Sequence, residues 1–114
     1  QSELEEYQAI ATELGMSALV EAHDEREVEM ALRAEASIIG VNNRDLKTFT
    51  VDINNSARYR KMVPKEVSFV SESGIKTAED IAKLLKNGTD AVLIGETLMR
   101  SENKKQALDE LRGI

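Results

Sequence analysis

The chain has 114 residues, 41% of them hydrophobic and 32% charged, and its formal net charge at pH 7 is -6. This balance indicates one globular domain and argues against a nucleic-acid partner, because an acidic surface repels phosphate backbones. The chain has no cysteine, a single histidine (His23) and no apolar run near the ~20 residues that span a bilayer, so we expect no metal, no cofactor, no membrane contact and a cytoplasmic location.

Amphipathic helices alternate with short apolar strands from the start of the chain. Ser2 and Glu5 fit a capping box for a first helix, which ends at Gly15. Asp24 and Glu27 fit a second box, which opens the next helix. The first two predicted strands are the apolar runs Ala18–Val20 and Ser37–Val41.

The second half of the chain continues this alternation after a long connection. A helix is predicted over residues 55–62, and Pro64 marks its end. Thr77 and Asp80 open a further helix, which stops at Gly88. The remaining predicted elements are the strands Val67–Ser71 and Ala91–Ile94, a short turn of helix at 97–99 and a last helix at 103–111.

The pattern favours an α/β fold with a parallel sheet. Strands that are apolar throughout are typical of parallel sheets covered on both faces, and the β–α alternation indicates right-handed crossover units. Both a doubly wound sheet and a (β/α) barrel fit this pattern. Because a complete barrel needs about 250 residues, a barrel would be present here only as a half, with four parallel strands and flanking helices.

Polar or glycine residues directly follow each apolar run. They are Glu21 after the first run, Asn42 and Arg44 after the second, Glu72, Ser73 and Gly74 after the third, and Gly95 and Glu96 after the fourth. The carboxyl ends of parallel strands share one edge of an α/β sheet, where active sites are built. We therefore expect these residues around one concavity.

Two turns in this set are suited to a phosphate group. Gly74 and Gly95 lack the Cβ atom that would hold a backbone away from phosphate oxygens, and a short helix after Gly95 adds the N–H groups of a helix start. A turn that simply requires glycine is the alternative at each position taken alone. Together the two turns predict a phosphorylated small molecule as the ligand.

Four segments resemble, in order, the motifs of the last four strands of the indole-3-glycerol phosphate synthase family. They are LVEAH at 19–23, IIGVNNRDL at 38–46, VSESGI at 70–75 and AVLIGE at 91–96. The resemblance implies strands five to eight, the C-terminal half of a (β/α)8 barrel. It also implies a carboxy-lyase of tryptophan biosynthesis, which converts 1-(2-carboxyphenylamino)-1-deoxyribulose 5-phosphate to indole-3-glycerol phosphate with loss of carbon dioxide and water.

The resemblance also implies residue roles: catalytic Glu21, Asn42 and Glu72, substrate-binding Arg44 and Ser73, and phosphate-binding Gly74, Gly95 and Glu96. A carboxylate at the rim of a desolvated pocket has a raised pKa, which suits Glu21 for acid–base chemistry. Glu72 is expected to orient substrate hydroxyls and to pair with a catalytic lysine. Glu96 is expected to offer its backbone N–H, with its carboxylate turned away from the phosphate.

Each of these roles has a structural alternative. The alternatives are rim salt bridges at Glu21 and Glu72, an Asx turn at Asn42 and Asn43, a surface ion pair of Arg44 with Asp45, and a rim or capping role for His23. The family's catalytic lysines belong to the first four strands, and none of those motifs is present. We therefore expect the chain alone to be inactive.

Half a barrel leaves strand edges and an apolar sheet face unsatisfied, which predicts a homodimer or pairing with the missing N-terminal half. The lack of an initiating Met suggests a fragment or a processed product. Two rival functions stay open: another phosphate-binding barrel, whose families lack the NNRDL stretch, and a non-catalytic, self-associating half-barrel or phosphate-binding module.

Overall fold

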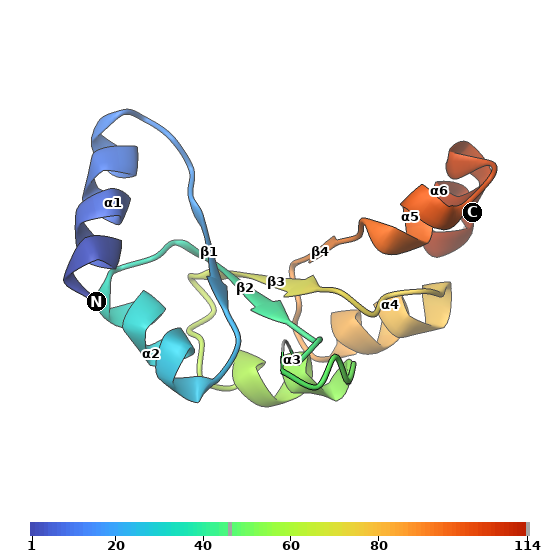
Figure 1. The fold of residues 1–114 in the computed structure, drawn as a ribbon, viewed down its shortest axis with the longest axis horizontal. Coiled ribbons are helices and arrows are strands. Elements are labelled where there is room, and N and C mark those ends of the chain that lie inside the picture. Colours follow the sequence, from blue (N-terminus) through green and yellow to red (C-terminus); the bar gives the residue numbers. More distant parts are fainter. Residues whose placement is uncertain (46, 114) are drawn as a thin grey trace.

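The computed structural model describes residues 1–45 and 47–113, so Leu46 of the IIGVNNRDL segment and Ile114 lie outside the described residues. Helices and strands alternate along the chain (Figure 1). In order they are α1 (Ser2–Glu13), β1 (Leu19–Ala22), α2 (Glu25–Arg33), β2 (Ile38–Asn42), α3 (Asn54–Arg60), β3 (Ser68–Glu72), α4 (Ala78–Lys86), β4 (Ala91–Leu93), α5 (Glu96–Arg100) and α6 (Lys104–Leu111). Across these residues, no helix is both long enough and apolar enough to cross a membrane.

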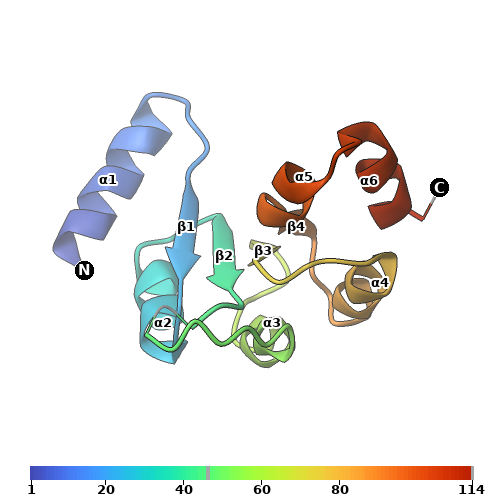
Figure 2. The ribbon, with the colours of Figure 1, turned by 45° about the vertical axis from the view of Figure 1, so that its right-hand side comes forward.

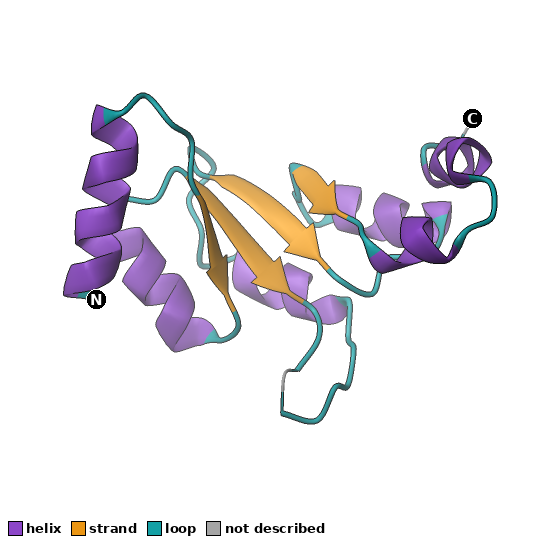
Figure 3. Ribbon diagram, turned by 45° about the horizontal axis from the view of Figure 1, so that its top comes forward, coloured by secondary structure: helices purple, strands orange, loops and turns teal. Residues whose placement is uncertain are grey.

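The strands form one parallel sheet in the spatial order β1-β2-β3-β4. In a doubly wound sheet, the order in which successive strands are added reverses at a switch point. Here each strand is added on the same side of the strand before it. Helices α2, α3 and α4 lie along one side of this sheet (Figure 3). Sequential strands with helices on one side are the arrangement of a (β/α) barrel, so the prediction of a half-barrel with four parallel strands is confirmed.

Strands β1, β2 and β3 extend further toward their carboxyl ends than the apolar runs predicted, whereas β4 ends at Leu93, one residue earlier than predicted. Glu21, Asn42 and Glu72 are strand residues, because parallel pairing continues through them: Glu21 is opposite Gly40, and Asn42 is opposite Glu72. Charge and amide groups at these positions do not interrupt a backbone ladder, which depends on N–H and C=O groups alone. Helix α3 ends at Arg60, earlier than predicted and well before Pro64.

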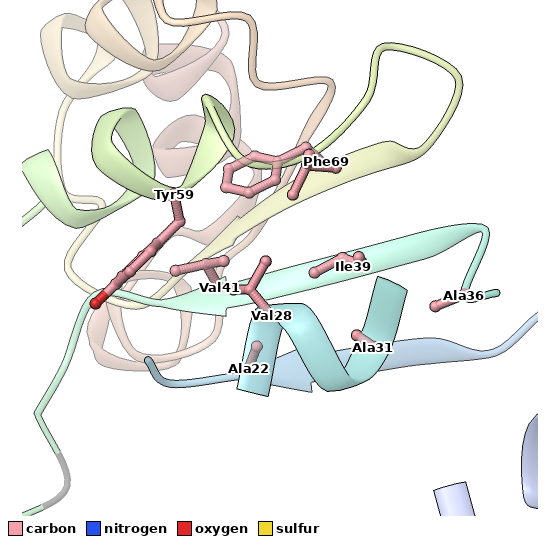
Figure 4. Close-up of a cluster of buried hydrophobic side chains, with 9 residues drawn as sticks. Ala22, Val28, Ala31, Ala36, Ile39, Val41, Tyr59 and Phe69 are labelled. Atoms are coloured by element: carbon pink, nitrogen blue, oxygen red, sulfur yellow. The ribbon is translucent and has the colours of Figure 1, made fainter. Parts of the chain in front are cut away.

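The buried core lies between the sheet and helices α2 and α3 (Figure 4). Every second strand residue points to this side. The nine residues of the core cluster are Ala22, Val28, Ala31, Ala36, Ile39, Val41, Tyr59, Val63 and Phe69. Burial of these apolar side chains holds helices and sheet together, since each Å² removed from water is worth about 25 cal/mol.

The opposite face of the sheet is open in the described part of the chain. Leu19 is 43% exposed and Leu93 is 51% exposed, and both belong to this face. The uncovered apolar sheet face that half a barrel is expected to leave is therefore present among residues 1–45 and 47–113. The physical reason is that four strands of a barrel form only part of the wall around its interior.

The two ends of the chain lie at opposite edges of the sheet. Figure 2 shows α1 beside β1 at one edge and α5 with α6 beyond β4 at the other. Helix α1 has no buried residue, and Gln1 at its start donates a hydrogen bond from Nε2 to the carbonyl of Met30. The strand edges of β1 and β4 thus carry no further strand among the described residues.

Two of the predicted helix starts differ from the structure. At α2 the Asp24 carboxylate accepts the backbone N–H of Glu27 at 2.8 Å, as predicted. The Glu27 carboxylate, however, accepts the backbone N–H of His23 rather than that of the cap residue. The box at Ser2 is wrong, because the helix already includes Ser2, and Gln1 in the capping position makes no side-chain cap. The serine lies one position too far along the helix to reach a free N–H.

The predicted start of α4 is confirmed, and it supports a test of stability. The Thr77 hydroxyl accepts the Asp80 N–H at 3.1 Å, and the Asp80 carboxylate accepts the Thr77 N–H at 3.1 Å. We expect Thr77→Ala to lower the free energy of unfolding by about 1 kcal/mol, because it leaves a helix donor without a partner. Urea unfolding followed by circular dichroism measures this. The exposed Thr12→Ala inside α1 is the control, and an equal effect of both would contradict the capping role.

Candidate active site

One cleft of about 1130 Å³ opens at the carboxyl ends of the strands. All eight predicted site residues line it: Glu21, Asn42, Arg44, Glu72, Ser73, Gly74, Gly95 and Glu96. They come from all four strands or from the turns that directly follow them. The structure thus brings together every residue of the predicted set, and adds cleft residues that the sequence did not indicate: Val51, Ile53, Ile75, Lys76, Asp80, Leu93, Ile94, Thr97 and Arg100.

Glu21 and Glu72 face each other from strands that flank β2. Strand β2 makes room for them because Gly40 has no side chain, and a Cβ atom there would meet the Glu72 carboxylate. Asn42 lies next to both: its Nδ2 donates a hydrogen bond of 3.4 Å to Oε1 of Glu21, and its backbone is opposite Glu72 in the register. Two carboxylates and one amide therefore share one wall of the cleft.

Glu72 is the buried member of the pair, only 6% exposed. Its Oε2 atom has no hydrogen-bond partner among the described residues. Burial, followed by the charge of Glu21 and a hydrogen bond shared with it, raises the pKa of Glu72 to about 7. A carboxyl group with this pKa keeps its proton over part of the neutral range, where an ordinary glutamate has lost it. The ion pairs among the described residues do not include Glu72, so the expected rim salt bridge is not formed there.

His23 lies at the rim beside the cleft residue Glu21, but it does not line the cleft itself. Its backbone N–H and its Nδ1 atom both contact the Glu27 carboxylate, at 2.6 Å and 3.0 Å. Its Nε2 atom is 3.9 Å from Oε1 of Glu21. The expected rim or capping role of His23 fits these contacts, because the ring is anchored to the first turn of α2.

Arg44 and Glu96 link the second and fourth units across the cleft. Nη2 of Arg44 donates to the Glu96 carboxylate at 2.8 Å, and Arg100 adds a contact of 3.1 Å to its other oxygen. The hydrogen bond from Arg44, with the charge of Arg100, holds the pKa of Glu96 below its usual range. The alternative pairing of Arg44 with Asp45 is wrong, because the Asp45 carboxylate accepts backbone N–H groups of its own loop.

The two predicted phosphate turns differ in what their glycines do. Gly74 has a φ of +75°, and a Cβ atom there would strike Val51, so the fold itself requires glycine at this position. Gly95 has an ordinary φ of -117°, and no atom lies within 4 Å of where its Cβ would be. The fold does not require glycine at 95. Thr97 joins the two turns by a 2.7 Å hydrogen bond to the carbonyl of Ile75.

Asn43 is the residue whose role the sequence reading missed. The Asx turn belongs to Asn42 alone, whose Oδ1 accepts the N–H of Arg44 at 2.9 Å. Asn43 is instead 0% exposed and bonds to residues of α3 and β3 and of the turn after β3. In the sequence, Asn43 stands out only because it follows the end of a strand. That position predicts a turn but does not reveal hydrogen bonds to residues far away in the chain.

A family model described as indole-3-glycerol phosphate synthase matches residues 1–111. The synthase of Ruminiclostridium cellulolyticum is 61% identical over 110 residues, which are 96% of this chain and 42% of that protein. The synthase of Leuconostoc mesenteroides is 51% identical over 111 residues, covering 97% of this chain and 42% of its own length. The chain thus spans about two fifths of the length of these relatives.

Solved structures agree on the fold. A chain of the BexX/CysO complex of Amycolatopsis orientalis superposes with a TM-score of 0.73 at 18% identity, over 96% of this chain and 45% of that one. A native KDPGal structure gives a TM-score of 0.67 at 16% identity, over 96% and 56%. The match over nearly all of this chain but about half of each neighbour agrees with a half-barrel. Because its family model covers almost every residue, the chain belongs to the indole-3-glycerol phosphate synthase family.

Proposed function

We propose that the chain is the C-terminal half, strands five to eight, of an indole-3-glycerol phosphate synthase. The whole enzyme converts 1-(2-carboxyphenylamino)-1-deoxyribulose 5-phosphate to indole-3-glycerol phosphate, with loss of carbon dioxide and water. The observation that carries this proposal is the convergence of two carboxylates, an amide and two glycine turns on one cleft. A phosphorylated substrate made and consumed inside the cell also fits a cytoplasmic location.

The two carboxylates have different roles in this proposal. Glu21 is half-exposed at the mouth of the cleft and serves in acid–base chemistry, where loss of water needs a proton delivered to the departing hydroxyl. Asn42 holds the Glu21 carboxylate and offers its amide to the substrate. Glu72 orients the sugar hydroxyls and pairs with a lysine from the absent half, which its unpartnered Oε2 atom supports.

The phosphate group sits between the third and fourth units in this proposal. Backbone N–H groups of Ser73, Gly74, Gly95 and Glu96 surround it, and the start of α5 adds the positive end of a short helix. The open space at Gly95 supports this position, because the fold alone gives no reason for a glycine there. Arg44 approaches the substrate from the opposite wall, and its Nε atom is buried without a partner among the described residues.

The decisive experiment compares the 114-residue chain alone with the same chain joined to the preceding half of the Ruminiclostridium cellulolyticum relative. We expect the joined protein to form indole-3-glycerol phosphate, detected by its fluorescence, and the chain alone to give no measurable turnover. The physical reason is that stabilisation of the transition state needs the complete, preorganised set of groups, including the lysines of the other half.

Variants of the joined protein test the roles. Glu21→Gln is expected to lower kcat by about 100-fold or more, the usual effect of losing an acid–base group. Glu66→Gln, in an exposed turn before β3, is the matched control and should leave kcat unchanged. Turnover by the chain alone would contradict the need for a second half, and full activity of Glu21→Gln would contradict the assigned role.

The open face of the sheet, which carries Leu19 and Leu93, favours a second proposal. Two copies of the isolated chain associate into a homodimer through this face and the strand edges. Leu19 and Leu93 would lose their exposure in such a pair. We expect sedimentation velocity to show a dimer, and Leu19→Lys to shift it toward monomer. Leu85→Lys, 73% exposed on the outer helix α4, is the control. A monomer at all concentrations would leave a non-catalytic, self-associating module without support.

A further inference from the structure

We infer that Asn43 is a positioning residue that sets the backbone of the Ser73–Gly74 turn for its ligand. The inference rests on the proposed phosphate contact at this turn. Asn43 directly follows β2, does not line the cleft and is 0% exposed. It acts on the site only through the residues that it touches, so its contacts decide what it does.

Every polar group of Asn43 is used. Its Nδ2 donates to the Ser71 hydroxyl at 2.8 Å and to the Ser73 carbonyl at 3.0 Å. Its Oδ1 accepts the Ser56 hydroxyl at 2.8 Å, and the hydroxyls of Ser56 and Ser71 lie 2.6 Å apart. Its backbone N–H donates to the carbonyl of Glu72 at 2.8 Å. One side chain therefore ties α3 to the end of β3 and to the turn that follows.

The turn adopts a conformation that needs such support. Ser73 has a φ of +69° and Gly74 a φ of +75°, so two successive residues lie in the left-handed region. Glycine enters this region freely, whereas a serine does so only where its surroundings hold it there. The hydrogen bond from Asn43 falls on the carbonyl of this serine.

Because the peptide bond is planar, the hydrogen bond to the Ser73 carbonyl also fixes the direction of the Gly74 N–H. In a trans peptide the C=O of one residue and the N–H of the next point in opposite directions. The Ser73 carbonyl points into the buried wall toward Asn43, so the Gly74 N–H points away from that wall. Ser73 and Gly74 line the cleft, and the Gly74 N–H donates to no backbone carbonyl among the described residues. Asn43 thus aims a free donor at the place proposed for the phosphate.

The test uses isotope-labelled chain, inorganic phosphate as the probe and two buried variants. Asn43→Asp keeps the shape of the side chain but loses the Nδ2 donor to Ser73. Ser56→Ala removes a bond of the same network and leaves that donor in place. Both are expected to lower the melting temperature, so stability alone does not distinguish them. Where the aspartate variant does not fold, the smaller and uncharged Asn43→Ser replaces it.

We expect Asn43→Asp, and not Ser56→Ala, to move the ¹³Cα and ¹³Cβ shifts of Ser73, which report its backbone conformation. We also expect the Kd for phosphate, followed at the Gly74 amide, to rise about fivefold, as after the loss of one hydrogen bond. Unchanged Ser73 carbon shifts in Asn43→Asp, or equal changes in both variants, would overturn the positioning role. If the unmodified chain gives no phosphate response, the phosphate contact fails, while the carbon shifts still decide the role of Asn43.

Discussion

Glu72→Gln is expected to stabilise the folded chain by an amount that grows with pH, from about 1 kcal/mol at pH 5 to roughly 3 kcal/mol at pH 8. The folded state raises the pKa of Glu72 from an ordinary 4.5 to about 7. Between these two values the unfolded chain has lost the proton and the folded chain keeps it. Stability of the unmodified chain therefore falls as pH rises through this window, and it levels off above the folded pKa. Glutamine resembles the protonated form at every pH and escapes this loss.

Urea unfolding at pH 5 and at pH 8, at one protein concentration, measures the difference between the variant and the unmodified chain. The control is Glu66→Gln, an exposed carboxylate in the turn that precedes the amino end of β3 and does not line the cleft. For this control, the difference in unfolding free energy from the unmodified chain should be nearly the same at pH 5 and at pH 8. A stabilisation by Glu72→Gln that stays constant or shrinks as pH rises would show that folding does not raise the pKa of Glu72.

Gly40→Ala is expected to destabilise the chain by about 1–3 kcal/mol, the usual result of adding atoms to a filled space. The new Cβ would occupy the position of the Glu72 carboxylate, so that side chain must leave its buried place beside Glu21. The pKa of Glu72 should then fall toward the ordinary range of an exposed carboxyl group. In the joined protein, kcat should fall with it.

The matched control is Gly95→Ala, where the added Cβ meets no atom and φ is ordinary, so the free energy of unfolding should stay the same. A double variant makes the test specific. In a Glu72→Ala background the collision partner is absent, and Gly40→Ala should lose most of its destabilising effect. An unchanged penalty in that background would place the conflict elsewhere.

The order of strands and helices followed from sequence because contiguous apolar runs and helical spacing are local signals. The sequence pattern could not distinguish a barrel from a doubly wound sheet, because both use the same β–α alternation. Only the spatial order of the strands separates them. Eight of the cleft residues were predicted by one rule, that strand ends share an edge, and this rule needs no knowledge of side-chain contacts.

The contacts within the site were beyond the sequence because they join distant residues. Arg44 and Glu96 are 52 positions apart, and Asn43 bonds to Ser73 across 30 positions. Nothing in the sequence distinguishes Gly40 from an ordinary strand glycine; only the structure shows that the Glu72 side chain reaches over it. The box at Ser2 failed for the opposite reason: a local motif was present, but the helix begins one residue earlier than the motif assumed.

Each strand sends alternate side chains to opposite sides, and the two sides carry separate tasks. The helix-covered side holds Ile39, Val41 and Phe69, while the open side holds Gly40, Asn42 and Glu72. A substitution on the open side would therefore change the chemistry of the cleft and leave the packing between sheet and helices unchanged. A sheet of this kind allows substrate specificity to change by single substitutions along a strand, while the fold stays the same.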